Sequence, residues 1–176
     1  MRWQQLIMDL FQRISRELEV VLGGLTVDDL NQRPGSDCNS IGWLAWHLTR
    51  SHDRNMTELM VEEQLWIRDR WYAKFNLTPN PAETGFKHSA EEVTTFRSPD
   101  SNTLMAYHRA VLKRIEIYIN NALSEEELER ETYSATLHIS GLVEARLVGV
   151  INDSMQHVGQ AAYLRGLLKG KGWLDR

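Results

Sequence analysis

Four long segments of the chain repeat their apolar residues at steps of three and four, and this spacing restricts the fold more than any other feature. Residues at these steps lie on one face of an α-helix, and an amphipathic helix is stable when that face is buried. The segments cover residues 3–22, 41–61, 101–123 and 141–168. They predict an all-α fold, an antiparallel-type four-helix bundle, which commonly builds metal and cofactor sites from side chains on facing helices.

Residues that favour helix ends flank these segments. Ser40 is the expected N-cap of the second helix, and Ser140 is the expected N-cap of the last. Gly170 and Gly172 are expected to end the last helix. Residues 132–140 are rich in β-branched and aromatic side chains and read as extended, but no convincing pair of strands is predicted.

The connection between the second and third helices is long and irregular. Residues 62–75 suggest a further helical piece, and residues 76–87 hold two prolines and Gly85, which indicates a loop. Ser89 and Glu92 then form a capping-box pattern that opens a short helix. We therefore expect the bundle to carry an elaborated middle connection of short helices.

Length and charge narrow the class of protein. The 176 residues, 42% of them hydrophobic, are enough for one globular domain over residues 1–176. A net charge of -4 gives no basic field, which argues against a nucleic-acid partner. No apolar run reaches membrane-spanning length and the N-terminus lacks a secretory core, so we expect a cytoplasmic protein with no membrane partner. The single cysteine, Cys38, excludes an intramolecular disulfide.

Two chemically versatile side chains, Asp153 and His157, interrupt the apolar face of the last helix. They lie four residues apart, so their head groups point at one spot inside the bundle. A buried carboxylate without a partner is costly. Asp153 could therefore be protonated, form a structural ion pair with Arg146 or with His157, or bind a metal ion together with His157.

A metal site needs a third ligand from another helix, and the second helix offers His47 and His52. His52 lies near the middle of the apolar stripe and is the deeper of the two, whereas His47 lies at its edge. An edge position suits a ligand that faces an accessible cavity, and a deep histidine is more often a hydrogen-bonded core residue. The pattern alone does not choose between them.

The chain resembles the DinB-like family of four-helix metalloproteins, which includes the metal-binding domain of mycothiol-dependent maleylpyruvate isomerase. The resemblance rests on "LTVDDLNQRPGSDCNSIGWLAWHLTRSHD", "AYHRAV" and "NDSMQHVGQAAYLRGLL", which occur in that order. It implies a divalent-metal site whose ligands here would be His47, Asp153 and His157. Many members of the family have a histidine at the place of Asp153, while the maleylpyruvate isomerase branch has a carboxylate there.

Two histidines and one carboxylate occupy one side of an ion and leave positions for water or substrate, as catalytic sites do. Zinc or nickel suits this donor set, and iron can also use it. The resemblance implies a metal-dependent enzyme acting on a small-molecule substrate, such as a transferase or isomerase that uses a low-molecular-weight thiol, or a hydrolase. The alternative is a non-enzymatic, stress-response helical dimer whose metal site is structural or vestigial.

Other residues have weaker claims on the site. Arg165 lies at the edge of the inward arc and could bind an anionic substrate group or pair with an acidic neighbour. Trp43 and Trp46 flank the "WH" histidine and could form a pocket wall. Three further histidines have other expected places. His108 is expected to be half-exposed on its helix, His138 to lie near the pocket mouth, and His88 to lie at the surface.

The tryptophans of the middle connection bear on assembly. Trp66 and Trp71 lie in a segment that has less core available to bury them, which favours a contact with a second copy of the chain. The family resemblance also favours a homodimer. We therefore expect a homodimer formed through the middle connection or the helices beside it.

Overall fold

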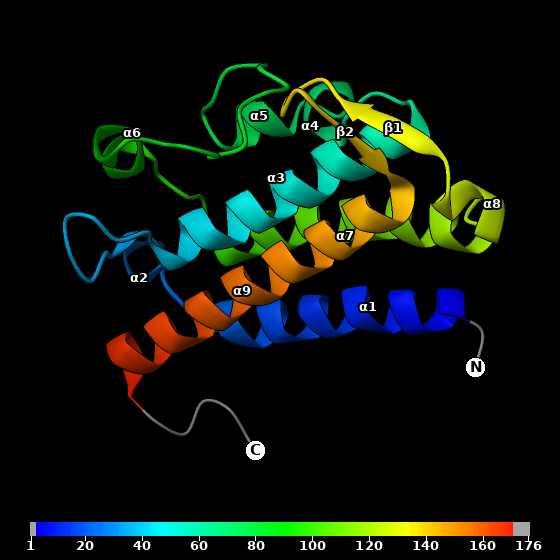
Figure 1. Ribbon diagram of the computed structural model, residues 1–176. Coiled ribbons are helices and arrows are strands. Elements are labelled where there is room, and N and C mark those ends of the chain that lie inside the picture. Colours follow the sequence, from blue (N-terminus) through cyan, green and yellow to red (C-terminus); the bar gives the residue numbers. More distant parts are fainter. Residues whose placement is uncertain (1–2, 171–176) are drawn as a thin grey trace.

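The computed structural model describes residues 3–170, and four long helices form a bundle within them (Figure 1). They are α1 (Trp3–Leu22), α3 (Ile41–Met60), α7 (Ser101–Asn121) and α9 (Val143–Lys169). α9 packs against α1 and α3, and α7 contacts the same two helices. The prediction of an all-α four-helix bundle is confirmed.

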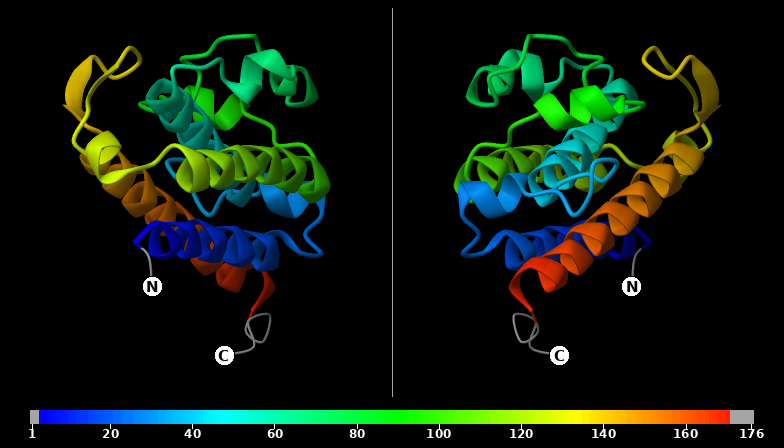
Figure 2. Two further views of the ribbon diagram at one scale, coloured as in Figure 1. Left: turned by 90° about the vertical axis from the view of Figure 1, so that its right-hand side faces the viewer. Right: turned by 90° about the vertical axis from the view of Figure 1, so that its left-hand side faces the viewer.

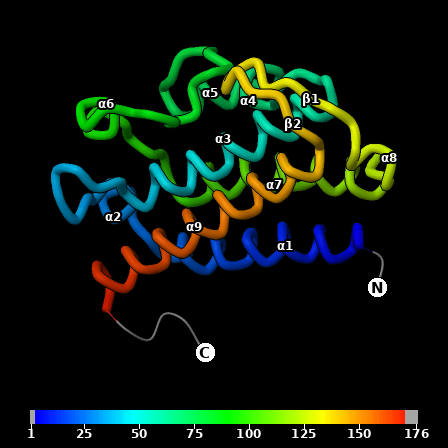
Figure 3. Tube along the Cα trace, in the orientation of Figure 1, coloured from blue at the N-terminus to red at the C-terminus, as the bar shows by residue number. Residues whose placement is uncertain are grey.

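The helices do not all alternate in direction, and in this respect the antiparallel-type prediction needs correction. The colour gradient in Figures 1 and 3 shows that α3 and α7 run the same way, as do α1 and α9. The pairs α3–α9 and α1–α7 are antiparallel. The chain must therefore return along the full length of α3, about 30 Å, before α7 begins, which explains the long connection.

Short helices form this connection, as predicted, and also lie in the other loops. They are α2 (Val27–Asn31), α4 (Leu65–Arg68), α5 (Trp71–Lys74), α6 (Ala90–Thr95) and α8 (Glu125–Leu128). The Ser40 hydroxyl accepts a hydrogen bond from the amide of Trp43 and caps α3, as its position predicts. Ser89 and Glu92 form the expected capping box at the start of α6.

A β-hairpin precedes α9, and here two expectations are wrong. β1 (Glu131–Ser134) pairs antiparallel with β2 (Ile139–Leu142), and Ser140 lies opposite Tyr133 in this ladder. Ser140 therefore does not cap α9, which begins at Val143 with Leu142 as its N-cap residue. The strands are too short for a clear sequence signal, because the pairing depends on the turn that joins them. Figure 2 shows the hairpin beside one end of the bundle.

The core is continuous from α1 to the middle connection, and α3 is almost entirely buried. Trp66 and Trp71 are only 0% and 8% exposed, so the expectation that they lack a core is wrong. They give no support for a homodimer, which remains a prediction. Trp173 and Gly172 lie outside the described residues. Within residues 3–170, no helix combines the length and apolar character that spanning a bilayer requires.

Candidate metal centre

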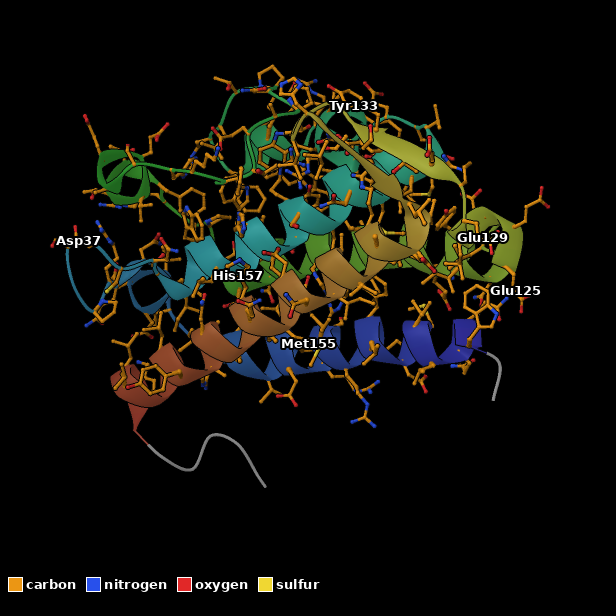
Figure 4. The ribbon with its side chains drawn as sticks, viewed as in Figure 1. Asp37, Glu125, Glu129, Tyr133, Met155 and His157 are labelled. Carbon is orange, nitrogen blue, oxygen red and sulfur yellow. The ribbon has the colours of Figure 1, made fainter. Side chains whose placement is uncertain are left out.

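Three side chains from two helices meet between α3 and α9. His47, Asp153 and His157 each offer one ligand atom, and these atoms all lie within 4.8 Å of one another. In Figure 4, His157 lies on the side of α9 that faces α3, whereas Met155 lies on the side nearer α1. The packing of α3 against α9 therefore brings together the three residues that the sequence singles out.

Asp153 and His157 are within reach of each other on α9. The His157 Nε2 atom lies 3.3 Å from Asp153 Oδ1. Two ligand atoms bound at about 2 Å to a tetrahedral ion are separated by roughly this distance. The second carboxylate oxygen of Asp153, Oδ2, is buried and has no hydrogen-bond partner among the described residues. The donor set thus fits a cation, which would compensate an otherwise unsatisfied carboxylate oxygen.

His47 is held with one particular nitrogen available. Its Nδ1 is hydrogen-bonded to the main-chain carbonyl of Thr84. A carbonyl oxygen only accepts, so the proton is on Nδ1 and the lone pair is on Nε2. The indole of Trp43 stacks on the imidazole at 4.7 Å and fixes the plane of the ring. This is the usual way in which a protein orients a metal-binding histidine.

The same arrangement applies to His157. Its Nδ1 donates to Oε1 of Gln160 at 2.9 Å, and its Nε2 is the atom that faces Asp153. Gln160 lies three residues further along α9, so the helix itself sets this contact. Both histidines are thus oriented through Nδ1, and Nε2 remains available to an ion.

A tight backbone turn places Thr84 against His47. Gly85 has φ +82, and a Cβ built on it would lie 2.7 Å from Trp43 Cζ2 and 2.8 Å from Trp46 Cζ3. Only glycine accommodates both this backbone conformation and this close approach. The segment is also tied to α3 by Arg50, whose guanidinium donates to the carbonyls of Glu83 and Pro81.

The protonation of the three groups follows from burial and from their neighbours. Burial lowers the pKa of His47 to about 4, so this imidazole is neutral at pH 7. Burial alone would lower the pKa of His157, but its hydrogen bonds to Asp153 and Gln160 raise it above 6.5. Burial raises the pKa of Asp153, but His157 and His47 outweigh this effect and lower it below 3.8. An ion would therefore compete with a proton for His157.

A cavity of about 360 Å³ lies beside the three residues, and His47 and Asp153 form part of its wall. Its polar wall includes the side chains Arg54, Asn55 and Arg146. Its apolar wall includes Leu137 and Ile139 from the hairpin segment and Val150 from α9. The volume is in the range of small-molecule sites.

An ion pair between Asp153 and Arg146, one of the alternatives for Asp153, is absent from the described residues. Arg146 is instead paired with Glu58 and donates to Asn55 Oδ1 at 2.9 Å. These partners lie on α3, one and two turns beyond the segment that faces Asp153. Of the two structural pairs considered for Asp153, the structure contains the one with His157.

His52 does not join the group. It is fully buried and donates from Nε2 to the Ser154 hydroxyl at 2.6 Å, as a hydrogen-bonded core residue does. His108 is also fully buried and donates to the Thr49 hydroxyl, so the expectation that it is half-exposed is wrong. The two rings are 5.8 Å apart and form a separate buried pair.

Three weaker candidates for substrate binding lie away from the cavity. The Arg165 guanidinium donates to the carbonyls of Val21 and Gly23 at the end of α1. Binding of an anionic substrate group by Arg165 stays a prediction. Trp46 is fully buried, and Trp43 contributes by stacking on His47. Neither tryptophan belongs to the cavity wall, and substrate binding by these two residues stays a prediction.

The remaining two histidines also differ from expectation. His88 is partly buried instead of lying at the surface, because it accepts a hydrogen bond from Trp43 Nε1 and pairs with Glu83. His138 lies in the hairpin turn, contacts the Tyr133 hydroxyl and is not part of the cavity wall.

Three further residues shape this site and are not among those predicted from the sequence. Gln160 could have been identified from the sequence, because it lies one turn after His157 on the same helix. Arg54 could also have been identified, since it follows His47 by seven residues and therefore lies on the same helix face. Thr84 could not have been identified from the sequence, because only the folded path of the middle connection brings its carbonyl to His47.

The chain is similar to a protein family and to a solved structure. The family model described as DinB superfamily matches residues 10–161. A crystal structure titled as the conserved protein of locus from Enterococcus faecalis is similar, with a TM-score of 0.85 and 28% sequence identity. The match covers 97% of this chain and 99% of that one. No curated protein matches the chain.

Proposed function

The chain belongs to the DinB superfamily, and from this premise we propose that it binds one divalent metal ion through His47, Asp153 and His157. The observation that carries the proposal is the convergence of three ligand atoms within 4.8 Å, two of them on histidines whose Nδ1 is already engaged. The buried, unpartnered Oδ2 of Asp153 supports it further. Zinc or nickel suits these donors, and iron can also use them.

The proposed ion serves a reaction of a small molecule. His47 and Asp153 form part of the wall of the 360 Å³ cavity, so a substrate in this cavity would lie beside residues that would hold the ion. A divalent ion in such a site lowers the pKa of a bound water or thiol and acts as a Lewis acid. The residues of the chain supply the rest: Thr84 and Gln160 orient the two histidines, and residues of the hairpin form part of the cavity wall.

Within this proposal, the protein is a metal-dependent transferase or isomerase that uses a low-molecular-weight thiol. Its resemblance to the maleylpyruvate isomerase branch, including a carboxylate at position 153, supports the thiol. The thiol would enter through the same cavity, which is large enough for a small molecule.

One observation favours a second candidate, a non-enzymatic helical protein. Asp153 and His157 already form an ion pair across one helical turn, and this pair stabilises the fold without any metal. In that case the metal site would be structural or vestigial, and the chain would act through a dimer.

Metal content tests the proposed site itself. Protein prepared without chelators and supplemented with zinc or nickel should contain about one ion per chain by elemental analysis. His157→Ala should lose it, and the control His138→Ala, at an exposed histidine of the hairpin turn, should keep it. A wild-type protein without metal, or a His157→Ala protein with as much metal as the wild type, would reject the site.

The thiol is tested on cobalt-substituted protein. Glutathione, mycothiol and bacillithiol are added in turn, and the visible spectrum of cobalt reports a thiolate that binds to the ion. We expect one of them to change the spectrum and to support metal-dependent turnover of electrophiles. If none changes the spectrum of a fully loaded protein, the thiol-dependent activity is excluded and the non-enzymatic candidate is favoured.

A further inference from the structure

A buried cation without a partner faces the cavity. Arg54 is 5% exposed, and its guanidinium has neither a hydrogen bond nor an ion pair within the described part of the chain. Its Nε atom is fully buried and unsatisfied. The side chain forms part of the wall of the same cavity as His47 and Asp153. An arginine side chain stays protonated in proteins, so this is a buried positive charge.

The carboxylates near Arg54 attract it through space but form no hydrogen bond or ion pair with it in the described part of the chain. Glu58, which attracts Arg54 through space, is paired with Arg146 and also accepts hydrogen bonds from Thr136. Asp153 faces His157. By contrast, the buried Arg50 of the same helix donates to Gln64, Tyr107 and main-chain carbonyls. The fold therefore provides hydrogen-bond partners for Arg50 but none for Arg54, which lies at the cavity wall.

A second cation reinforces this charge. Arg146 also belongs to the cavity wall, and its Nη1 atom is buried without a hydrogen-bond partner, although its Nη2 is paired. The wall of one cavity thus carries two guanidinium groups, of which Arg146 is already paired with Glu58. Arginine donors are the usual partners of carboxylates, because the planar guanidinium can form two parallel hydrogen bonds.

We propose that Arg54, with Arg146 beside it, binds a carboxylate group of the small molecule that occupies this cavity. The inference rests on the proposed function, because it names the substrate class of the same site. Arg54 follows His47 by two helical turns, about 10 Å along the axis. The ligand is therefore an elongated organic acid, whose carboxylate lies at Arg54, whose apolar body contacts Ile139 and Val150, and whose reactive end reaches His47 and Asp153.

The carboxylate could belong either to the thiol or to the electrophile, since both would enter the cavity. The probes are therefore two matched pairs. 3-Phenylpropionate and its neutral amide represent an acid without a thiol, and their binding to zinc-loaded protein is measured by calorimetry. 3-Mercaptopropionate and 2-mercaptoethanol represent a thiol with and without a carboxylate, and their binding is followed on cobalt-substituted protein.

We expect the wild type to bind at least one acid about tenfold more tightly than its neutral counterpart. Arg54→Gln should abolish this preference, Arg54→Lys should retain part of it, and the control Arg109→Gln, at an exposed arginine paired with Glu19, should not change it. A preference for 3-mercaptopropionate assigns the carboxylate to the thiol, and a preference for 3-phenylpropionate assigns it to the electrophile. Each of these results supports the proposal.

Thermal stability separates this role from a structural one. Because Arg54 has no partner to lose, Arg54→Gln should melt at the same temperature as the ligand-free wild type or higher. A lower melting temperature together with an unchanged acid preference would overturn the proposal. So would a wild-type protein that contains one metal ion per chain and binds acid and amide equally. If the protein contains no bound metal but still binds an acid more tightly than its neutral counterpart, the metal site is rejected and the Arg54 site is retained.

Discussion

The imidazole of His47 donates its Nδ1 proton to the main-chain carbonyl of Thr84, a residue of the connection between α3 and α7. This contact joins the least regular part of the chain to the most buried helix. It fixes the tautomer of a histidine that has Asp153 and His157 as neighbours. The middle connection is therefore part of the candidate site, although none of its side chains is among the three candidate ligands.

Replacing Asp153 tests whether its carboxylate serves an ion. Asp153→Asn should keep the helix content and weaken metal affinity by about 10- to 100-fold, because one charged ligand is lost. Asp153→His should retain metal, because a histidine at this position is the commoner pattern of the family. Melting temperatures with and without zinc or nickel should rise strongly in the wild type and Asp153→His, and less in Asp153→Asn. Equal shifts in all three proteins would remove Asp153 from the site.

The turn at Gly85 should be sensitive to a single methyl group. Gly85→Ala adds a Cβ that would lie 2.7 Å from Trp43 and 3.1 Å from His47 Nδ1, at φ +82. We expect a loss of about 2–4 kcal/mol in the free energy of unfolding, measured in urea, together with weaker metal binding.

Gly24 provides a matched control for this change. It also has a positive φ, +71, but a Cβ there would meet nothing within 4 Å. Gly24→Ala should therefore cost only the backbone strain, about 1 kcal/mol, and leave metal binding unchanged. Equal losses for the two variants would show that the close approach to Trp43 and His47 does not matter.

The buried pair His52 and His108 predicts a loss of stability in acid. Burial lowers the pKa of His52 to about 3 and of His108 to about 4, from 6.5 in the unfolded chain. Between pH 6.5 and 4 the unfolded state binds these protons and the folded state does not, so acid favours unfolding. The free energy of unfolding should fall by up to about 1.4 kcal/mol per pH unit for each of the two groups.

Urea unfolding of the metal-free protein at pH 7.5, 6 and 5 measures this slope. His108→Gln should reduce it, because one of the two protons is no longer taken up, whereas the exposed His138→Gln should leave it unchanged. His47, with a pKa lowered to about 4, adds to the slope, and His157, with a raised pKa, opposes it. A slope that does not respond to His108→Gln would show that His108 takes up its proton in the folded state as well.

The homodimer suggested by the family resemblance is tested by mass. Sedimentation equilibrium at micromolar concentration should give about twice the 20.4 kDa of one chain. Because Trp66 and Trp71 are buried within the chain, Trp66→Phe should not change this mass. A mass near that of one chain would contradict the homodimer.

The sequence by itself determined the parts of this protein that depend on local periodicity. The apolar spacing predicted the four long helices, and the spacing of Asp153 and His157 placed both side chains on one face of α9. These relationships follow from 3.6 residues per turn and need no knowledge of the rest of the chain.

Only the tertiary structure decided which partners meet across elements. The packing of α3 against α9 selected His47 over His52, and the pairing of Arg146 with Glu58 removed it from Asp153. The contact of Thr84 with His47 depends on the folded path of the middle connection, and the hairpin depends on the pairing of two short strands. Such choices depend on long-range geometry and on which buried charges are already paired, and these are properties of the packed structure that local spacing does not encode.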